Sequence, residues 1–136
     1  MTSTSIAVLG YIFWTLFLMV VMEILRVVVS VKTGRAANDF LPDGTDVSPF
    51  ANRLARAHAN CYESFPIVGG ILLLALAINQ QSITDPLALW LLAARVGQSC
   101  THVASGSSKA AQIRFLFFLT QLSIVSWWLV KIAAQI

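Results

Sequence analysis

Four polar side chains recur along one short segment, at a spacing that gathers them on one side of a helix. At intervals of three, four and three residues stand Arg53, Arg56, Asn60 and Glu63. At 100° per residue, this spacing confines the four side chains to an arc of roughly 80°. Guanidinium groups pair with carboxylates through two parallel hydrogen bonds, and a side-chain amide hydrogen-bonds other amides. The chemistry that this face offers is recognition of a ligand that carries carboxylates.

Two further segments repeat the same rhythm and add positive charge. The first holds Glu23, Arg26, Ser30 and Thr33. The second holds Arg95, Gln98, His102 and Ser105, and Arg114 follows it in the chain. Five of the side chains in these stripes are arginines and two are glutamates, which leaves an excess of three positive charges where they converge. A pocket with this surplus suits a small acidic peptide.

Simple packing is the alternative explanation for these polar side chains. Glu63 could neutralise Arg56 or Arg95, and an arginine at the level of the lipid headgroups can extend its side chain to water. Such pairing accounts for one arginine, whereas five need partners. His58 lies outside the arc of the first stripe, so we interpret it as an interfacial or helix-packing residue rather than a ligand contact.

The composition of the chain is that of a membrane protein. Hydrophobic residues make up 57% of its 136 residues and charged residues 11%, against about 45–50% and about 25% in an ordinary soluble domain. This length suits a single domain over residues 1–136. The net charge of +3 is too small and too scattered for a nucleic-acid surface. Cys61 and Cys100 are expected to be buried free thiols, not a disulfide or a metal site.

The first two helices are expected to be long. The first runs from about Ser5 to about Lys32, and we expect a retained membrane span, because no basic segment or small-residue cleavage pattern of a signal peptide accompanies it. Ser48 and Pro49 form a cap-and-proline signature that begins the second helix. That helix continues to about Ile78.

The third helix is expected to begin at a similar signature, with Asp85 as its cap and Pro86 directly after it, and to stop at Gly106. Ser107 or Ser108 then caps the fourth helix, which runs to the C-terminus. The short connection makes the last two helices antiparallel neighbours. The predicted fold is therefore all-α, an integral membrane bundle of four helices.

The distribution of lysine and arginine predicts the orientation of this bundle. Lys32 and Arg35 flank the first connection, and Lys109 and Arg114 flank the third. The positive-inside rule places both connections in the cytoplasm and both termini outside, with Lys131 as the one opposing charge. In a bacterium, the membrane would be the inner membrane.

The string RLARAHANCYESFP, residues 53–66, resembles a family signature. This signature, R-x-x-R-A-H-x-N-x-x-E followed by a proline, is that of the membrane-associated proteins in eicosanoid and glutathione metabolism, the MAPEG family. The resemblance implies a homotrimer of four-helix subunits that binds glutathione as a co-substrate at subunit interfaces near the cytoplasmic side. It further implies a bacterial-type microsomal glutathione transferase-like member, which acts on lipophilic small molecules dissolved in the membrane lipid and needs no metal.

The resemblance also assigns roles to individual residues. By position, Arg56, Asn60 and Glu63 hold glutathione, and Arg114, in the string AQIR, stabilises the glutathione thiolate from a neighbouring subunit. A thiol with a pKa of about 8.5 is mostly protonated at neutral pH, and a guanidinium at the positive end of the fourth helix favours the reactive anion. The same binding site is expected to include Arg26, Arg53, Arg95, Gln98 and His102.

Two departures from the family pattern leave the reaction open. Where several family enzymes have tyrosines that contact glutathione, this chain has RVGQSCTHVASGSS, with Gln98 and His102 in their place. The string that contains Arg114 aligns only with a gap. The first hypothesis is a glutathione transferase or peroxidase acting on lipophilic electrophiles. The second is a non-catalytic MAPEG-fold protein that binds a lipid ligand or a partner, and the third is a small transport or scaffold subunit.

Overall fold

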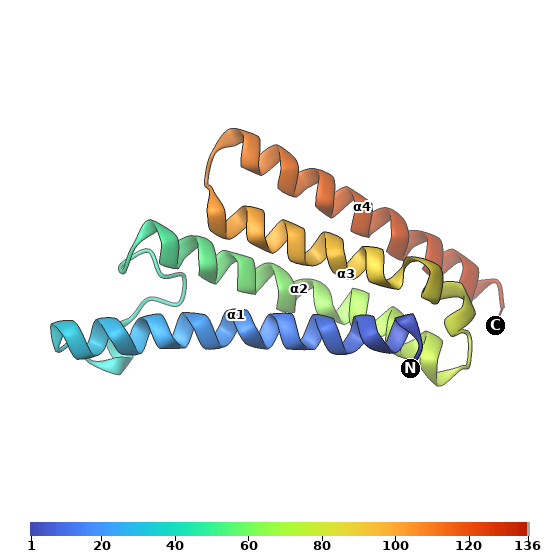
Figure 1. Ribbon diagram of the computed structural model, residues 1–136, viewed down its shortest axis with the longest axis horizontal. Coiled ribbons are helices and arrows are strands. Elements are labelled where there is room, and N and C mark those ends of the chain that lie inside the picture. The colour runs from blue at the N-terminus through green and yellow to red at the C-terminus, as the bar shows by residue number, and fades with distance from the viewer. Residues whose placement is uncertain (136) are drawn as a thin grey trace.

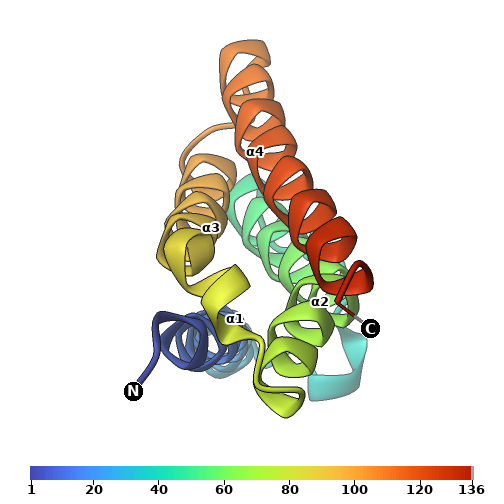
Figure 2. The same ribbon diagram turned by 90° about the vertical axis from the view of Figure 1, so that its right-hand side faces the viewer.

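The computed structural model describes residues 1–135, which form a bundle of long helices (Figure 1). The elements in chain order are α1 (Ser3–Thr33), the short 3-10 helix η1 (Ala37–Asp39), α2 (Pro49–Ala77), α3 (Gln81–Ala104) and α4 (Ser108–Ala133). The first three long helices all contact one another, whereas α4 packs mainly on α3 and only lightly on α2. Figure 2 shows α4 lying along α3, on the side away from α1.

Three of the helices, α1, α2 and α4, are long and apolar enough to cross a membrane. A span of the ~30 Å hydrocarbon layer needs about 20 residues at 1.5 Å each, and each of these helices has at least 26. The less apolar α3 contacts the other three helices, so its polar side chains are sheltered by protein. The predicted all-α membrane bundle is confirmed.

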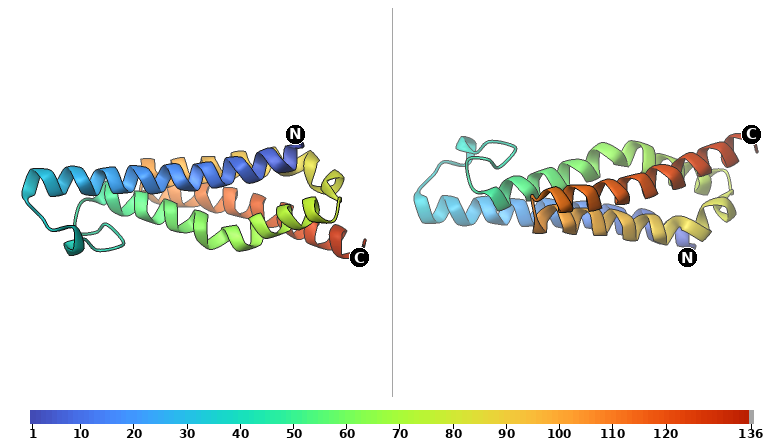
Figure 3. Two further views of the ribbon diagram at one scale, coloured as in Figure 1. Left: turned by 90° about the horizontal axis from the view of Figure 1, so that it is seen from below. Right: turned by 90° about the horizontal axis from the view of Figure 1, so that it is seen from above.

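Both charged connections lie at the same end of the bundle. The α1–α2 and α3–α4 connections are at one end, and the N-terminus, the C-terminus and the α2–α3 turn are at the other (Figure 3). The polar stripes of α2 and α3 therefore run from the connection end toward the middle of the molecule.

The side-chain caps expected for α2 and α4 are present. The Ser48 hydroxyl oxygen accepts a hydrogen bond from the Ala51 N–H at 3.0 Å, with Pro49 as the first helical residue. The Ser107 hydroxyl oxygen accepts from the Ala110 N–H at 3.2 Å. Each cap satisfies one of the N–H groups that a helix leaves without an internal partner, so these local signatures fix where both helices begin.

The expected start of α3 is wrong, whereas its expected last residues, up to Ala104, are correct and only the glycine stop is missing. This helix begins at Gln81, with Pro86 inside it, and it ends at Ala104 without a left-handed glycine at position 106. Asp85 caps α1 instead, because its Oδ1 accepts from the Thr4 N–H at 2.8 Å and from the Thr4 hydroxyl at 2.7 Å. A cap supplied by another helix leaves no trace in the local sequence pattern.

We expect Asp85→Ala to lower the free energy of unfolding by about 1–2 kcal/mol, because the Thr4 N–H in the first turn of α1 loses its acceptor. The measurement is unfolding in mixed micelles by SDS titration. Asp39→Ala is the matched control, since the Asp39 carboxylate makes no hydrogen bond within residues 1–135. Equal losses of unfolding free energy in the two variants would show that the Asp85 carboxylate does not stabilise the start of α1.

Apolar side chains from all four long helices meet in one core. Its most deeply buried large members include Tyr11, Leu54, Leu72, Leu91 and Trp128. The outer faces of α1 and α4 are covered with exposed apolar residues, as helices facing lipid should be. Both cysteines are free as expected, but only Cys61 is buried, whereas Cys100 is exposed on the described chain.

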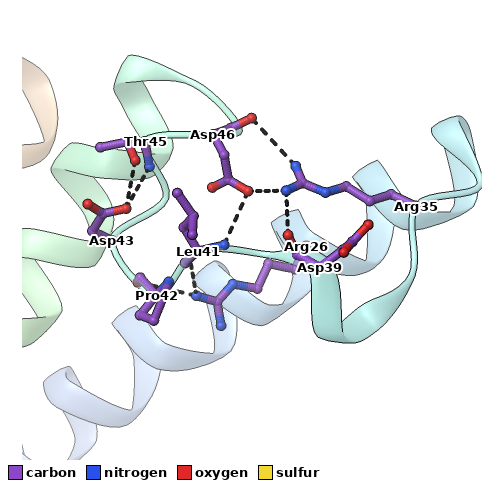
Figure 4. A network of polar contacts seen from close by, with 8 residues as sticks. All are labelled: Arg26, Arg35, Asp39, Leu41, Pro42, Asp43, Thr45 and Asp46. Carbon is purple, nitrogen blue, oxygen red and sulfur yellow. Dashed lines mark hydrogen bonds and ion pairs between the residues drawn. The ribbon is translucent and has the colours of Figure 1, made fainter.

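A polar network folds the α1–α2 connection against the end of α1 (Figure 4). Arg35 pairs with the Asp46 carboxylate and donates to the Asp39 carbonyl at 2.6 Å. Asp46 also accepts from the Leu41 N–H at 3.1 Å. Arg26 reaches the same segment and donates to the Pro42 carbonyl at 3.3 Å. The connection is thus held by charge-assisted hydrogen bonds rather than by apolar packing.

The order of this connection should depend on pH. Partial desolvation raises the pKa of Asp46, but hydrogen bonds from the Leu41 N–H and from Arg35 outweigh it, so the pKa is lowered overall. A carboxylate with a lowered pKa contributes stability above its usual pKa of about 3.9, and that stability is lost as pH falls through the lowered value. We expect the hydrogen-exchange protection of the Leu41 amide to hold from about pH 6 down to about pH 4 and to fall at lower pH, and we compare about pH 6 with about pH 2. Asp46→Asn should show weak protection at both values, and unchanged protection in wild type would contradict the mechanism.

Candidate functional site

Three arginines from two helices lie in the neighbourhood of His102 near the connection end. Arg53 and Arg56 lie on α2 and Arg114 on α4, and all three are close enough for their charges to act on His102. The histidine itself is buried on α3. We call Arg53, Arg56 and Arg114 the arginine cluster. Its position confirms that the polar stripes of α2 and α3 face a common region.

The arginine cluster has no acidic partner within residues 1–135. Arg53 Nε donates to the Val103 carbonyl at 2.9 Å, where the last turn of α3 leaves carbonyls without internal partners. Arg56 is exposed and Arg114 is half-buried, and neither forms an ion pair in the described chain. Glu63 is also exposed and unpaired over this range, so the pairing of Glu63 with Arg56 or Arg95 that simple packing required is absent.

The Asn60 amide fixes the hydrogen-bonding state of His102. Asn60 Nδ2 lies 3.2 Å from His102 Nδ1. Because an amide nitrogen is always a donor, Nδ1 is the acceptor and the proton of a neutral imidazole is on Nε2. Nε2 has no hydrogen-bond partner in residues 1–135. His102 therefore presents an N–H donor beside three guanidinium groups.

Arg95 lies deeper, near the middle of α3, and is only 3% exposed. Its Nη1 donates to the Asn60 carbonyl at 3.2 Å, and its Cζ lies 5.5 Å from the centre of the Tyr11 ring. Its Nε has no partner, and no ion pair of Arg95 occurs in the described residues. A buried arginine without an acid is costly, and such residues in membrane proteins usually mark functional sites.

Two glutamines connect this region to α4. Gln98 Nε2 donates to the Arg114 carbonyl at 3.3 Å, and Gln121 Nε2 donates to Gln98 Oε1 at 3.0 Å. Gln121 Nε2 also donates to the Phe117 carbonyl at 2.9 Å. These bonds hold α4 against α3 and fix the backbone of Arg114, while the Arg114 guanidinium is left free of hydrogen bonds in the described chain.

The structure limits the roles expected of two charged residues, Arg114 and Arg26. Arg114 is the seventh residue of α4, which begins at Ser108. The helix dipole acts within the first turn, so the expected help from the positive end of α4 is small. Arg26 is not an unpaired cation like the arginine cluster, because it pairs with Glu23 at 2.9 Å and donates to the Pro42 carbonyl.

A comparison with protein-family models decides what kind of protein carries this arrangement. The model described as MAPEG family matches residues 4–134. The chain belongs to the MAPEG family. The match takes in nearly the whole of all four helices, so the resemblance of RLARAHANCYESFP is confirmed. No significant match to a curated protein or to a solved structure was found. Membership makes this an integral membrane protein related to glutathione or eicosanoid metabolism.

The MAPEG signature did not reveal three polar residues that complete the buried network. The Tyr11 hydroxyl donates to the Cys61 carbonyl at 3.0 Å and lies 2.8 Å from Ser64 Oγ. Gln121 bridges to Gln98 as described above. A usable signal existed for Gln121, because it is a strongly polar residue in the middle of the apolar string FLFFLTQLSIVSWW.

An apolar groove runs between α1 and α2 of this MAPEG protein. Its volume is about 370 Å³, and it is lined by Ile12, Thr15, Leu16, Met19, His58, Tyr62, Phe65 and Pro66. The rings of His58 and Tyr62 lie 5.3 Å apart on its α2 side. His58 therefore points away from the buried polar network, as its position outside the first stripe indicated.

Proposed function

We propose that this MAPEG protein binds glutathione at the arginine cluster and acts as a glutathione transferase or peroxidase on lipophilic electrophiles. The observation that carries the proposal is that Arg53, Arg56 and Arg114 come from two helices to the same end of the bundle as the Asn60–His102 contact and that none of them forms an ion pair in the described chain. With Arg26 paired to Glu23, four arginines of the predicted site remain against the single carboxylate of Glu63. An anionic ligand balances this surplus, and family membership supports glutathione as that ligand.

The functional groups of glutathione match the side chains at hand. Its two carboxylates suit the forks of Arg53 and Arg56, and its ammonium group suits the exposed carboxylate of Glu63. Its amides can accept from the N–H of His102 and bond to the side chain of Asn60. Arg95 and Gln98 close the deep end of this polar region.

In the proposed reaction, Arg114 holds the sulfur of glutathione as the thiolate. The thiol releases its proton, and the positive guanidinium favours the anion that remains. The thiolate sulfur attacks the electrophilic carbon, a carbon–sulfur bond forms, and the leaving group departs with the electron pair of the broken bond. Because the Arg114 side chain makes no hydrogen bond within residues 1–135, it is free for this role.

The assembly and orientation belong to the same proposal. We propose that α3 is the fourth span of a single four-span domain over residues 1–136, with the two charged connections in the cytoplasm. Three copies would form a homotrimer with glutathione at the subunit interfaces, and Arg26 of one copy could then serve the site of its neighbour. Native mass spectrometry in detergent tests this, because it should show a particle of three chains.

A second candidate is a MAPEG protein that binds glutathione or a lipid ligand without catalysis. The observation that favours it is that the Gln98 side chain, which by the family resemblance stands where several enzymes have a tyrosine, is engaged with the Arg114 carbonyl and Gln121. A side chain fixed in this way is suited to a structural role. The two candidates share a binding site and differ in turnover.

We expect Arg56→Ala and Glu63→Gln each to weaken glutathione binding at least tenfold, since each removes a charge-assisted hydrogen bond. Isothermal titration with glutathione in detergent measures the affinity. Each site variant has a matched control that removes a charge of the same sign. Lys131→Ala removes a positive charge far from the arginine cluster, and Asp39→Asn removes a negative charge in the α1–α2 connection. Unchanged binding in both site variants would remove the proposed site.

A further inference from the structure

The turn of α2 that carries Asn60 lies just before a proline. Pro66 is inside α2 and has no N–H, so the carbonyl four residues earlier, at Tyr62, loses its usual helical donor. Figure 3 shows that α2 changes direction near its middle. A helix interrupted in this way fixes the turn before the proline less firmly. Contacts from neighbouring helices therefore decide where this turn points.

Side chains on α1 and α3 hold two successive carbonyls of this turn. The Tyr11 hydroxyl on α1 donates to the Cys61 carbonyl at 3.0 Å and lies 2.8 Å from Ser64 Oγ. Arg95 Nη1 on α3 donates to the Asn60 carbonyl at 3.2 Å. The Ser64 hydroxyl donates to the same carbonyl from within α2. The backbone at residues 60 and 61 is thus tied to both neighbouring helices.

Asn60 links this turn to His102. Its Nδ2 lies 3.2 Å from His102 Nδ1, and this bond keeps the proton of a neutral imidazole on Nε2. The distance is at the upper end of the usual range for a hydrogen bond that an N–H group donates. A small shift of the turn would therefore weaken the bond and free Nδ1 to carry the proton.

The Tyr11 ring has contacts that do not involve its hydroxyl. Tyr11 is 1% exposed, the Arg95 Cζ lies 5.5 Å from the centre of its ring, and the Phe65 ring centre lies 5.4 Å away. Gly69 leaves the space that the Phe65 ring occupies, because a Cβ at this position would come within 2.6 Å of that ring. Packing of the ring thus fixes the direction of the hydroxyl. Phenylalanine at position 11 would keep this packing and lose only the hydroxyl.

We propose that Tyr11 is a positioning residue whose hydroxyl holds the turn of α2 so that the Asn60 amide keeps His102 as an Nε2–H donor. Tyr11 acts through Asn60 and touches no ligand. Glutathione is rich in acceptors, its carboxylates and amide carbonyls, so a donor at His102 suits it and a lone pair does not. This consequence for glutathione rests on the proposed function, whereas the effect on His102 does not.

The test is nitrogen-15 NMR of the full chain in detergent, labelled with nitrogen-15 histidine and free of glutathione. The chain has two histidines, so His58→Gln leaves His102 as the single imidazole. At about pH 8.5, well above the usual histidine pKa of about 6.5, the ring is neutral and its two nitrogens report the tautomer. We expect the Nε2–H form in this background. Adding Tyr11→Phe should raise the ratio of Nδ1–H to Nε2–H about fivefold, the effect of one hydrogen bond.

Two further variants calibrate the spectrum. Asn60→Ala removes the donor itself and gives the full change in the tautomer ratio. Tyr62→Phe removes the hydroxyl of the other tyrosine, which is 53% exposed, and it should leave the ratio unchanged. An unchanged ratio in Tyr11→Phe, beside a changed one in Asn60→Ala, would overturn the proposal whether or not glutathione binds.

Isothermal titration with glutathione on the same variants separates this proposal from the proposed function. Tyr11→Phe should weaken glutathione binding about fivefold, in step with the tautomer ratio, and Tyr62→Phe should not. A changed ratio in a chain that binds no glutathione would support Tyr11 as a positioning residue for His102 and would count against the proposed function alone. Glutathione binding that stays as tight in Tyr11→Phe as in wild type, with an unchanged ratio, would count against the positioning role alone.

Discussion

Replacing Arg114 by alanine should lower the turnover of glutathione with a generic chloronitrobenzene electrophile by about 10²–10³-fold, the cost of losing one preorganised group that stabilises an anion. Glutathione affinity should change much less, because Arg53 and Arg56 still bind the carboxylates. The fold should persist as well, since Gln98 bonds to the Arg114 carbonyl, which alanine retains. The Arg114 guanidinium makes no hydrogen bond that the variant would break in the described chain.

The pH dependence of turnover makes this prediction specific to the thiolate. Without the guanidinium, the bound thiol should titrate nearer its usual pKa of about 8.5, so the variant should regain activity as pH rises toward 9. Lys109→Ala removes an exposed charge near the start of the same helix and serves as the control. The assay should also include reduction of a lipid hydroperoxide. If the wild-type protein binds glutathione but turns it over no faster than Arg114→Ala, the non-catalytic candidate is favoured.

The parts of the fold that sequence reasoning captured are those set by neighbours in the chain. The hydroxyl groups of Ser48 and Ser107 each cap a helix through an N–H group three residues away, so the pattern is visible locally. Asp85 looked like the same kind of cap, but its acceptor serves Thr4 at the far end of the sequence. A pattern shows that a side chain can cap, whereas only the packed fold shows which helix it caps.

In the candidate site, too, the sequence predicted what depends on a single helix and did not predict what depends on packing between helices. Helical spacing correctly placed Asn60, Arg95 and His102 on facing stripes, because it depends only on the geometry of one helix. It did not show the partners of each side chain, such as the Glu23 and connection contacts of Arg26. Nor did it show depth, so the burial of Arg95 came only from the packing of α3 against the other helices.

That burial gives Arg95 the second large predicted effect: Arg95→Met should increase the free energy of unfolding while it weakens glutathione binding. An arginine near the centre of a membrane helix costs about 2.5–3.5 kcal/mol. The substitution gives up a hydrogen bond of about 1 kcal/mol to Asn60 and a cation–π contact of about 0.5–1 kcal/mol with Tyr11. The Asn60 carbonyl still accepts from Ser64, so it is not left unsatisfied. The balance favours methionine by about 0.5–2 kcal/mol.

Measuring both quantities on the same variants decides why an uncompensated charge sits in the middle of this bundle. SDS titration in mixed micelles gives the free energy of unfolding, and isothermal titration gives the glutathione affinity, which should fall about tenfold in Arg95→Met. Arg95→Lys keeps the charge but not the planar fork, so it should show the loss of affinity without the gain in stability. If Arg95 were a packing residue, Arg95→Met would instead unfold more easily and bind glutathione as well as wild type. A gain in stability joined to a loss of affinity would show that Arg95 destabilises the protein without ligand and is kept because the ligand needs it.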